Sequence, residues 1–214
     1  MSRPSQYDRH TALDQAMQLF WRQGFHATSL KDIERALDMR PGSIYSHFGS
    51  KEKLFRESLE RYTRLGLAEL ERALAEGPTP LRALADYLRG LGTLYDQALP
   101  SRACMLVKSL LELDEREAAA REHVNTLLAG MEARFHQALE TARRQGELPD
   151  DLDTRRLARR LQADVMGLRA FAQRDVDRQA VEELAEDMAR ALESLGTSGH
   201  RDSPTAERAA EHSG

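Results

Sequence analysis

The chain has 214 residues, of which 41% are hydrophobic and 31% charged, and its formal net charge is −4. Its apolar content is enough for a folded core, and no apolar run reaches the length that a bilayer span requires. The single cysteine, Cys104, excludes an internal disulfide. The N-terminus lacks the apolar core of a signal peptide, so we expect a cytoplasmic protein without a membrane partner.

Apolar periodicity predicts helices along the chain and gives no convincing strand. The first helix is expected at residues 7–23. Gly24 suits the left-handed position after it, and Phe25 should pack back against Phe20. The second helix starts near Ser29, which forms a capping-box pattern with Asp32.

A short third helix is expected at residues 41–48, after the turn at 38–40. Pro41 suits its first position, where no amide donor is needed. Ile44 and Phe48 are four residues apart and should anchor one face in the core. A helix this short buries only one face, so the other is free to enter a DNA groove. The pattern predicts a helix-turn-helix at about 29–48.

Ser50 caps a fourth helix at about 51–75, and Lys51 lies in its first turn, where an amide dipole attracts phosphate. Further helices are expected at about 80–95, 102–113, 114–145, 153–174 and 177–195. The prediction is an all-α fold with a three-helix DNA-binding domain at 6–66 and a six-helix ligand-binding and dimerisation domain at 67–196. Residues 197–214 lack an apolar stripe and are expected to be a disordered tail.

The segment GSIYSHFGSKEKLF, with Gly24-Phe25, Thr28-Ser29 and Ile33 before it, resembles the TetR family of transcriptional regulators. The match covers the N-terminal quarter and departs at Asp38, where the family often has Gly, and at Pro41, where it often has Lys. The resemblance implies phosphate contacts from Ser29, Tyr45, His47 and Lys51. It implies base-edge contacts from Lys31, Arg40, Gly42, Ser43 and Ser46.

Simpler interpretations stay open for individual residues. His47 could be a partly buried histidine bonded to a backbone carbonyl, Tyr45 could be an amphipathic core residue, and Lys31 could be a solvated charge. Residues 1–60 carry nine Lys/Arg and eight Asp/Glu, so the DNA-binding part is only about +1. Affinity for DNA must therefore come from placed contacts, which still weaken with salt.

One recognition helix contacts few base pairs, so a homodimer on a palindromic, double-stranded operator is expected. The family resemblance places dimerisation on the last two large helices and an unknown small-molecule effector in the C-terminal domain. The effector should prefer the conformation that binds DNA poorly. Pocket candidates, each of which could be plain core, are Tyr62, Tyr87, Tyr95, Cys104, Met105, Phe135 and Met166.

Cys104 carries a separate hypothesis. If Ser101 caps its helix, the thiol lies in the first turn, near Arg102 and Lys108, where positive potential favours thiolate. The segment RACMLVKSLLEL partly resembles a stretch of TetR regulators, some of which sense reactive species through cysteine. The alternative is an inert, buried small hydrophobic residue.

The sequence gives little support for an enzyme. The seven histidines are scattered, and no catalytic set, metal-ligand set, phosphate loop or nucleophile elbow occurs. We therefore expect no enzyme, no cofactor and no metal. A helical adaptor without DNA binding and an activator of the same fold remain as alternatives to a repressor that an effector releases from its operator.

Overall fold

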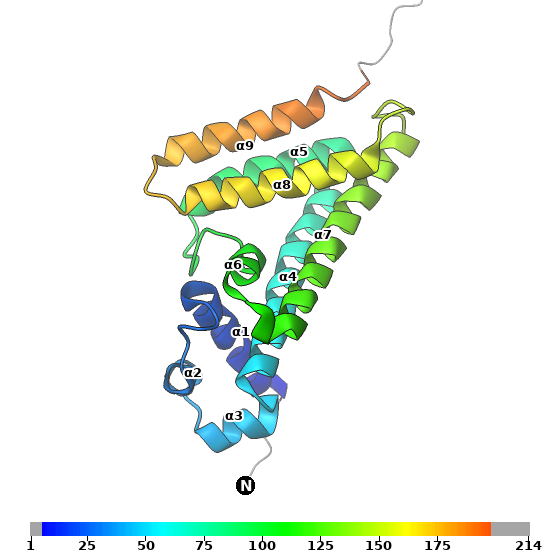
Figure 1. Ribbon diagram of the computed structural model, residues 1–214. Coiled ribbons are helices and arrows are strands. Elements are labelled where there is room, and N and C mark those ends of the chain that lie inside the picture. The colour runs from blue at the N-terminus through cyan, green and yellow to red at the C-terminus, as the bar shows by residue number, and fades with distance from the viewer. Residues whose placement is uncertain (1–5, 198–214) are drawn as a thin grey trace, which may run out of the picture.

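The computed structural model describes residues 6–197, which form helices and no strand. Nine α-helices and two short 3-10 segments, η1 and η2, follow one another along this part of the chain (Figure 1). They are α1 (Gln6–Gln23), α2 (Leu30–Leu37), α3 (Pro41–Phe48), α4 (Lys51–Glu76), α5 (Pro80–Gly90), η1 (Leu91–Tyr95), α6 (Met105–Glu112), η2 (Glu115–Glu117), α7 (Ala118–Arg144), α8 (Thr154–Ala172) and α9 (Arg178–Glu193). The expected all-helical fold class is confirmed.

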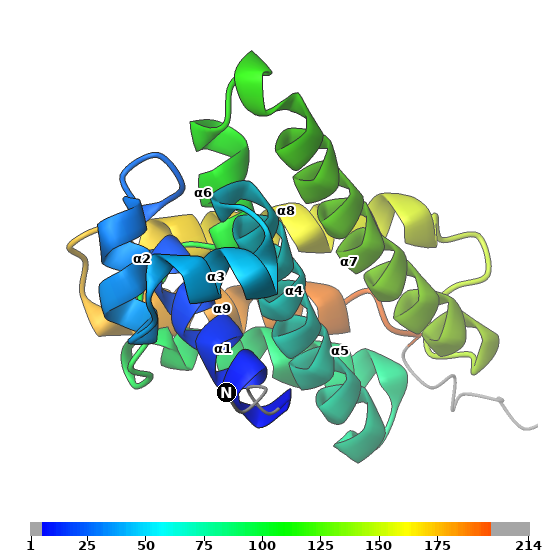
Figure 2. The same cartoon turned by 90° about the horizontal axis from the view of Figure 1, so that it is seen from below.

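The first three helices and the start of α4 share one core. Phe20, Phe48 and Phe55 are each no more than 1% exposed, and the rings of Phe20 and Phe55 meet edge to face at 5.1 Å. Phe25 stacks on Phe20 as expected and lies closer to Phe55, at 4.8 Å. In Figure 2, which views the molecule from below, this small unit faces the reader.

Local capping fixes the helix-turn-helix. Ser29 and Asp32 form the reciprocal capping box at the start of α2. Asp38 ends that helix in the left-handed region with φ +49°. Asp tolerates this backbone better than most residues, so the turn forms without the glycine common in the family. Pro41 begins α3, and Gly49 follows its end.

The remaining helices build a second core behind α4. In Figure 1, α4 and α7 run side by side from the small unit toward α5, α8 and α9, which cross the far end. Arg89 on α5 joins two of these layers, because its guanidinium binds Glu186 and Glu193 on α9. The structure has no helix in its described part that is long and apolar enough to cross a membrane.

Two expected helices begin or end elsewhere. The helix expected at 80–95 ends at Gly90 and continues as the tighter η1. There α9 approaches so closely that a Cβ on Gly92 would lie 3.2 Å from the Cα of Glu182. The helix expected at 102–113 begins only at Met105, because the Ser101 hydroxyl bonds Gln173 instead of capping it.

The apolar spacing of the last helix predicts that Val181, Leu184 and Leu192 face inward. Val181 and Leu192 are buried, but Leu184 is 38% exposed. The sequence also predicts polar caps at Asp114, Asp153 and Asp177, and all three are present.

The expected tail includes residues 198–214, which lie outside the part of the chain that the structure describes.

Candidate DNA-binding face and internal cavity

Helix α3 presents a polar face away from the core. Ile44 and Phe48 are 2% and 0% exposed and hold the helix from behind. Their four-residue spacing turns the opposite face outward, so that Gly42, Ser43 and Ser46 are exposed. Tyr45 is 48% exposed, which rules out the alternative of a core residue.

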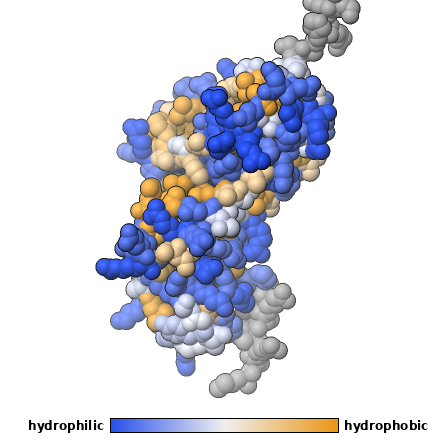
Figure 3. Space-filling model, turned by 45° about the vertical axis from the view of Figure 1, so that its right-hand side comes forward, coloured by the Kyte–Doolittle hydropathy of each residue, from blue (hydrophilic) through white to orange (hydrophobic). Residues whose placement is uncertain are grey.

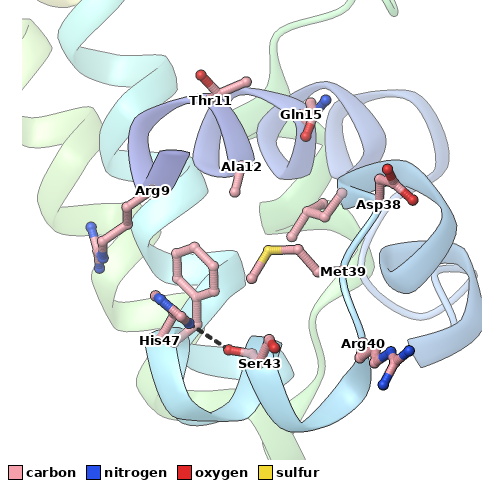
Figure 4. Close-up of a pocket in the computed structure, with 11 residues that line it drawn as sticks. Arg9, Thr11, Ala12, Gln15, Asp38, Met39, Arg40, Ser43 and His47 are labelled. Carbon is pink, nitrogen blue, oxygen red and sulfur yellow. Dashed lines mark hydrogen bonds between the residues drawn. The ribbon is translucent and has the colours of Figure 1, made fainter. Parts of the chain in front are cut away.

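A concave groove lies between α1 and the turn into α3, with a volume of about 520 Å³ (Figure 4). Arg9 lines it from α1, Arg40 from the turn, and Ser43 and His47 from α3. His47 is half-buried, and its Nδ1 bonds the Ser43 carbonyl at 2.6 Å. This matches the simpler interpretation of His47 and leaves its Nε2 without a bond in the described structure.

The other residues predicted to contact DNA differ in their exposure and in whether their polar groups already bind another part of the protein. Lys31 and Arg40 are exposed. The Ser29 hydroxyl is engaged with Asp32 in the capping box. The Lys51 ammonium lies over the Phe25 ring, 4.3 Å from its centroid, and burial lowers the pKa of Lys51 while Glu112 opposes that shift. Lys51 would therefore have to turn outward to meet a phosphate.

Sequence reasoning missed Arg9 as a member of this face. Its guanidinium binds Glu57 on α4 at 2.5 Å and lies over the Phe48 ring. No local pattern could have found it, because only the packing of α1 beside α3 brings it to the groove.

An internal cavity lies between α4, α5, α6, α7 and α8, with a volume of about 50 Å³. Five of the seven predicted pocket residues line it, namely Tyr62, Tyr87, Cys104, Phe135 and Met166. The other lining residues are Thr63, Gly66, Glu69, Leu91, Leu128, Met131, Gln162, Val165 and Arg169. The sequence alone did not indicate Gln162 or Arg169.

Two predicted pocket residues do not line this cavity. The Tyr95 hydroxyl lies within hydrogen-bond distance of the carbonyls of Ala172, Arg174 and Val176, so it ties η1 to the α8–α9 loop. Met105 is 1% exposed and belongs to the core shared with α1. Both side chains are held by helices that are distant in sequence.

Burial dominates the chemistry of the cavity wall. It raises the pKa of the Tyr62 phenol well above its ordinary value, with the nearby Cys104 adding to the shift and Arg169 opposing it. Burial likewise raises the pKa of Tyr87 to about 12. Both phenols are therefore neutral near pH 7 and can donate hydrogen bonds. Cys104 is 7% exposed and is the N-cap of α6 instead of a first-turn residue.

Helix α6 connects this cavity with the small N-terminal unit formed by α1, α2 and α3. Its N-cap, Cys104, lines the cavity. Farther along, the Lys108 ammonium donates to the Trp21 carbonyl at 2.6 Å. At the end of α6, the Glu112 carboxylate accepts from the backbone amides of Phe25 and His26 at 2.9 and 2.5 Å. Helix α6 thus binds both the end of α1 and the turn that leads to α2.

The fold and the exposed α3 face together define a helix-turn-helix protein with a helical domain behind it. Residues 12–58 match the model of the family described as "Bacterial regulatory proteins, tetR family". Residues 77–188, about half of the chain, match "Tetracyclin repressor-like, C-terminal domain". The chain belongs to the tetR family, whose members are transcriptional regulators and not enzymes.

Relatives extend over most of the chain. It is 31% identical over 167 residues to the HTH-type transcriptional repressor ComR of Escherichia coli K12, which covers 78% of this chain and 80% of ComR. A structure of the TetR-family regulator CifR, a cysteine-substituted form complexed with 26-bp double-strand operator DNA, is 29% identical with a TM-score of 0.80. It covers 89% of this chain and 99% of that one. Reduced Escherichia coli NemR, at 22% identity and a TM-score of 0.74, shares the fold.

Proposed function

We propose that the protein is a homodimeric repressor that binds a palindromic DNA operator and is released by a small-molecule or reactive-species effector. The observation that carries the DNA-binding part is the α3 face. Two buried anchors, Ile44 and Phe48, leave Ser43, Tyr45 and Ser46 exposed on the opposite side. Small hydroxyls and a phenol suit base edges and phosphate oxygens in a major groove.

The contacts divide by chemistry. Tyr45 and His47 are proposed to bind phosphates, together with Ser29 and with Lys51 once its ammonium leaves the Phe25 ring. Arg40, Gly42 and Ser43 are proposed to meet base edges, with Lys31 and Ser46 beside them. We add Arg9, because its side chain lines the groove with Arg40. CifR, of the same family and similar over nearly its whole length, is a relative whose structure contains operator DNA.

Homodimerisation is proposed through α8 and α9. The α9 face offers Leu184, which is 38% exposed, and the half-buried Met188 one turn later. Phe171 and Val176 near the α8–α9 loop are also half-buried. Figure 3 shows one face of the molecule, which is mainly hydrophilic and is broken by patches of hydrophobic residues. A two-fold dimer would present two α3 helices to half-sites about one helical turn apart.

The cavity is the proposed effector site, and α6 is the proposed connection. An effector that moves the Cys104 end of α6 would strain the bonds from Lys108 and Glu112 to the α1–α2 turn. Binding would then favour the conformation with displaced DNA-reading heads. Cys104 could itself react with an electrophile, and its burial means that the reagent would have to enter the cavity.

The test is selection of an operator from random DNA by the purified full-length protein, followed by mobility shift with the selected site. We expect a palindromic consensus and binding that weakens as salt rises. An Arg40→Ala and Ser43→Ala pair should change the consensus, whereas the exposed Arg155→Ala on α8 should not. Failure to bind any oligonucleotide at low salt would instead indicate the helical adaptor. Transcription that rises with operator occupancy would indicate the activator.

A further inference from the structure

The internal cavity is lined mainly by apolar and aromatic side chains. Its wall is built from Leu91, Leu128, Met131, Phe135, Val165 and Met166, with the phenols of Tyr62 and Tyr87. The rings of Tyr87 and Phe135 lie 6.1 Å apart. The two rings therefore pack against each other, and a wall that is apolar and contains aromatic side chains favours a flat, largely apolar molecule, whose ring can pack offset or edge to face against them.

Arg169 on α8 is the one cationic residue among the described residues that line this cavity. Its Nε atom is buried and has no hydrogen-bond partner, and no carboxylate of the described residues forms an ion pair with its guanidinium. The other described arginines that are similarly half-buried on long helices do have acidic partners, as Arg89 does with Glu186 and Arg134 with Glu71. A buried donor without an acceptor is costly, so this guanidinium lacks an anionic partner.

The remaining polar groups around the cavity do not supply that partner. The Gln162 amide donates to the Leu128 carbonyl at 2.7 Å. Tyr62 and Tyr87 are neutral donors, because burial raises the pKa of each phenol. Glu69 also lines the cavity, but its residue is exposed and it makes no ion pair with Arg169. No carboxylate of the described residues therefore neutralises the Arg169 guanidinium, which leaves this charge for an anion from outside the chain.

We propose that the cavity binds a small aromatic carboxylate, whose anionic group pairs with the Arg169 guanidinium while its ring lies among Tyr62, Tyr87 and Phe135. A guanidinium can bind a carboxylate through two parallel hydrogen bonds, which gives direction as well as affinity. The neutral phenols can donate further bonds to the same oxygens. This inference rests on the proposed effector role of the cavity and names the class of its ligand.

The size of the cavity implies that binding changes the protein. A volume of about 50 Å³ is well below the roughly 300–1,000 Å³ of most small-molecule sites. Met131 and Met166 are unbranched and can change rotamer to make room. A Cβ on Gly66 would meet no atom within 4 Å, so there is also free space beside α4. The ligand thus selects a widened form, as an effector coupled to α6 requires.

The sole tryptophan provides a direct measurement. The Arg169 guanidinium lies 5.8 Å from the centre of the Trp21 ring, and Trp21 is 6% exposed. Benzoate, phenylacetate and 3-phenylpropionate would be titrated into full-length protein while Trp21 fluorescence is followed, with calorimetry as a second readout. Benzamide and benzylamine serve as neutral and cationic control ligands of similar size. We expect saturable binding of at least one carboxylate, about tenfold or more tighter than that of either control ligand.

Substitutions test whether Arg169 is the group that binds the carboxylate. Arg169→Gln should weaken carboxylate binding about tenfold or more, and Arg169→Lys should fall between it and the wild type. Arg155→Gln, an exposed position on the same helix, should bind as the wild type does. Glu69→Gln should bind the carboxylate more tightly, because a like charge is removed.

Several outcomes would overturn the inference. They are equal binding of benzamide or benzylamine, unchanged binding by a folded Arg169→Gln, or no binding of any of the three carboxylates at millimolar concentration. The comparison of ligands uses the wild-type protein alone, so it tests whether binding requires the carboxylate even if Arg169→Gln does not fold. Operator binding is measured in the same samples. If it persists while the carboxylates fail, only the ligand class is wrong, and if it is absent the proposed function fails as well.

Discussion

At the residue scale, the four-residue spacing of Ile44 and Phe48 places both side chains on one face of α3. That face is buried, and the opposite face is exposed. Ile44 and Phe48 are buried because they share a face, and Tyr45, one residue on from Ile44, projects to the other side. The sequence predicted this division correctly. It did not predict that Lys51 would fold back over the Phe25 ring, since that ring comes from the preceding turn through tertiary packing.

Replacing Tyr45 by Ala should weaken binding to operator and to unrelated DNA by the same factor, about ten- to hundredfold, if its hydroxyl bonds a phosphate. Tyr45→Phe, which removes only the hydroxyl, is the matched variant and should lose most of the same factor. Competition binding with both DNAs measures it. A loss confined to the operator would show that Tyr45 reads bases instead. The Tm should change little, because the side chain is 48% exposed.

At the element scale, α2, α4, α5 and α8 each begin at a polar side chain that lies within three residues of the amide it binds. Ser29, Ser50, Thr79 and Asp153 all accept from the first turn of the helix they precede. Such bonds are local, so sequence reading found them. The start of α6 was misplaced because the Ser101 hydroxyl found a partner, Gln173, far along the chain.

The α2 cap should make stability depend on pH. Hydrogen bonds from Ser29 hold the pKa of Asp32 below its ordinary value of 3.8. The folded state thus binds the proton less readily than the unfolded state, so the stabilisation is complete above pH 3.8 and is lost as pH falls through the folded pKa. Asp32→Asn should show a flatter decline of stability between about pH 5 and 2 by denaturant unfolding. An identical slope in both proteins would contradict this.

The contacts between α6 and the α1–α2 turn should contribute measurably to the free energy of unfolding. Glu112→Gln keeps one acceptor oxygen but loses the charge that strengthens the bonds from Phe25 and His26. We expect the free energy of unfolding to fall by about 1–3 kcal/mol and operator affinity to fall with it. Glu115→Gln, an exposed change on η2, is the control. Unaltered stability and DNA binding in Glu112→Gln would mean that this contact transmits nothing.

At the scale of the whole molecule, the described residues are arranged in two cores joined by α4, with α6 packed between the internal cavity and the unit formed by α1, α2 and α3. The net charge of −4 is no obstacle to DNA binding in this arrangement. Exposed groups on one short helix and its flanking turn face outward, and a second copy would double them.

Dimer formation should depend on the α9 face. Leu184→Glu would place an unpaired carboxylate in the proposed interface, which costs several kcal/mol, so the dimer Kd should rise by at least about a hundredfold. Leu111→Glu on α6 is the matched control, because Leu111 is 82% exposed and lies on another element. Sedimentation equilibrium distinguishes the two. A Leu184→Glu protein that remains a dimer would place the interface elsewhere.

The sequence by itself determined the helices, most of their caps and the outward face of α3, because these depend on hydrogen bonds and spacings within a few residues. It also named five of the residues that line the cavity. Only the tertiary structure decided that Tyr95 and Met105 lie outside it, that Glu112 binds the α1–α2 turn, and that the Arg169 Nε has no hydrogen-bond partner. The bond between Phe25 and Glu112 joins residues 87 positions apart, and no local pattern encodes which distant side chain will fill a given space.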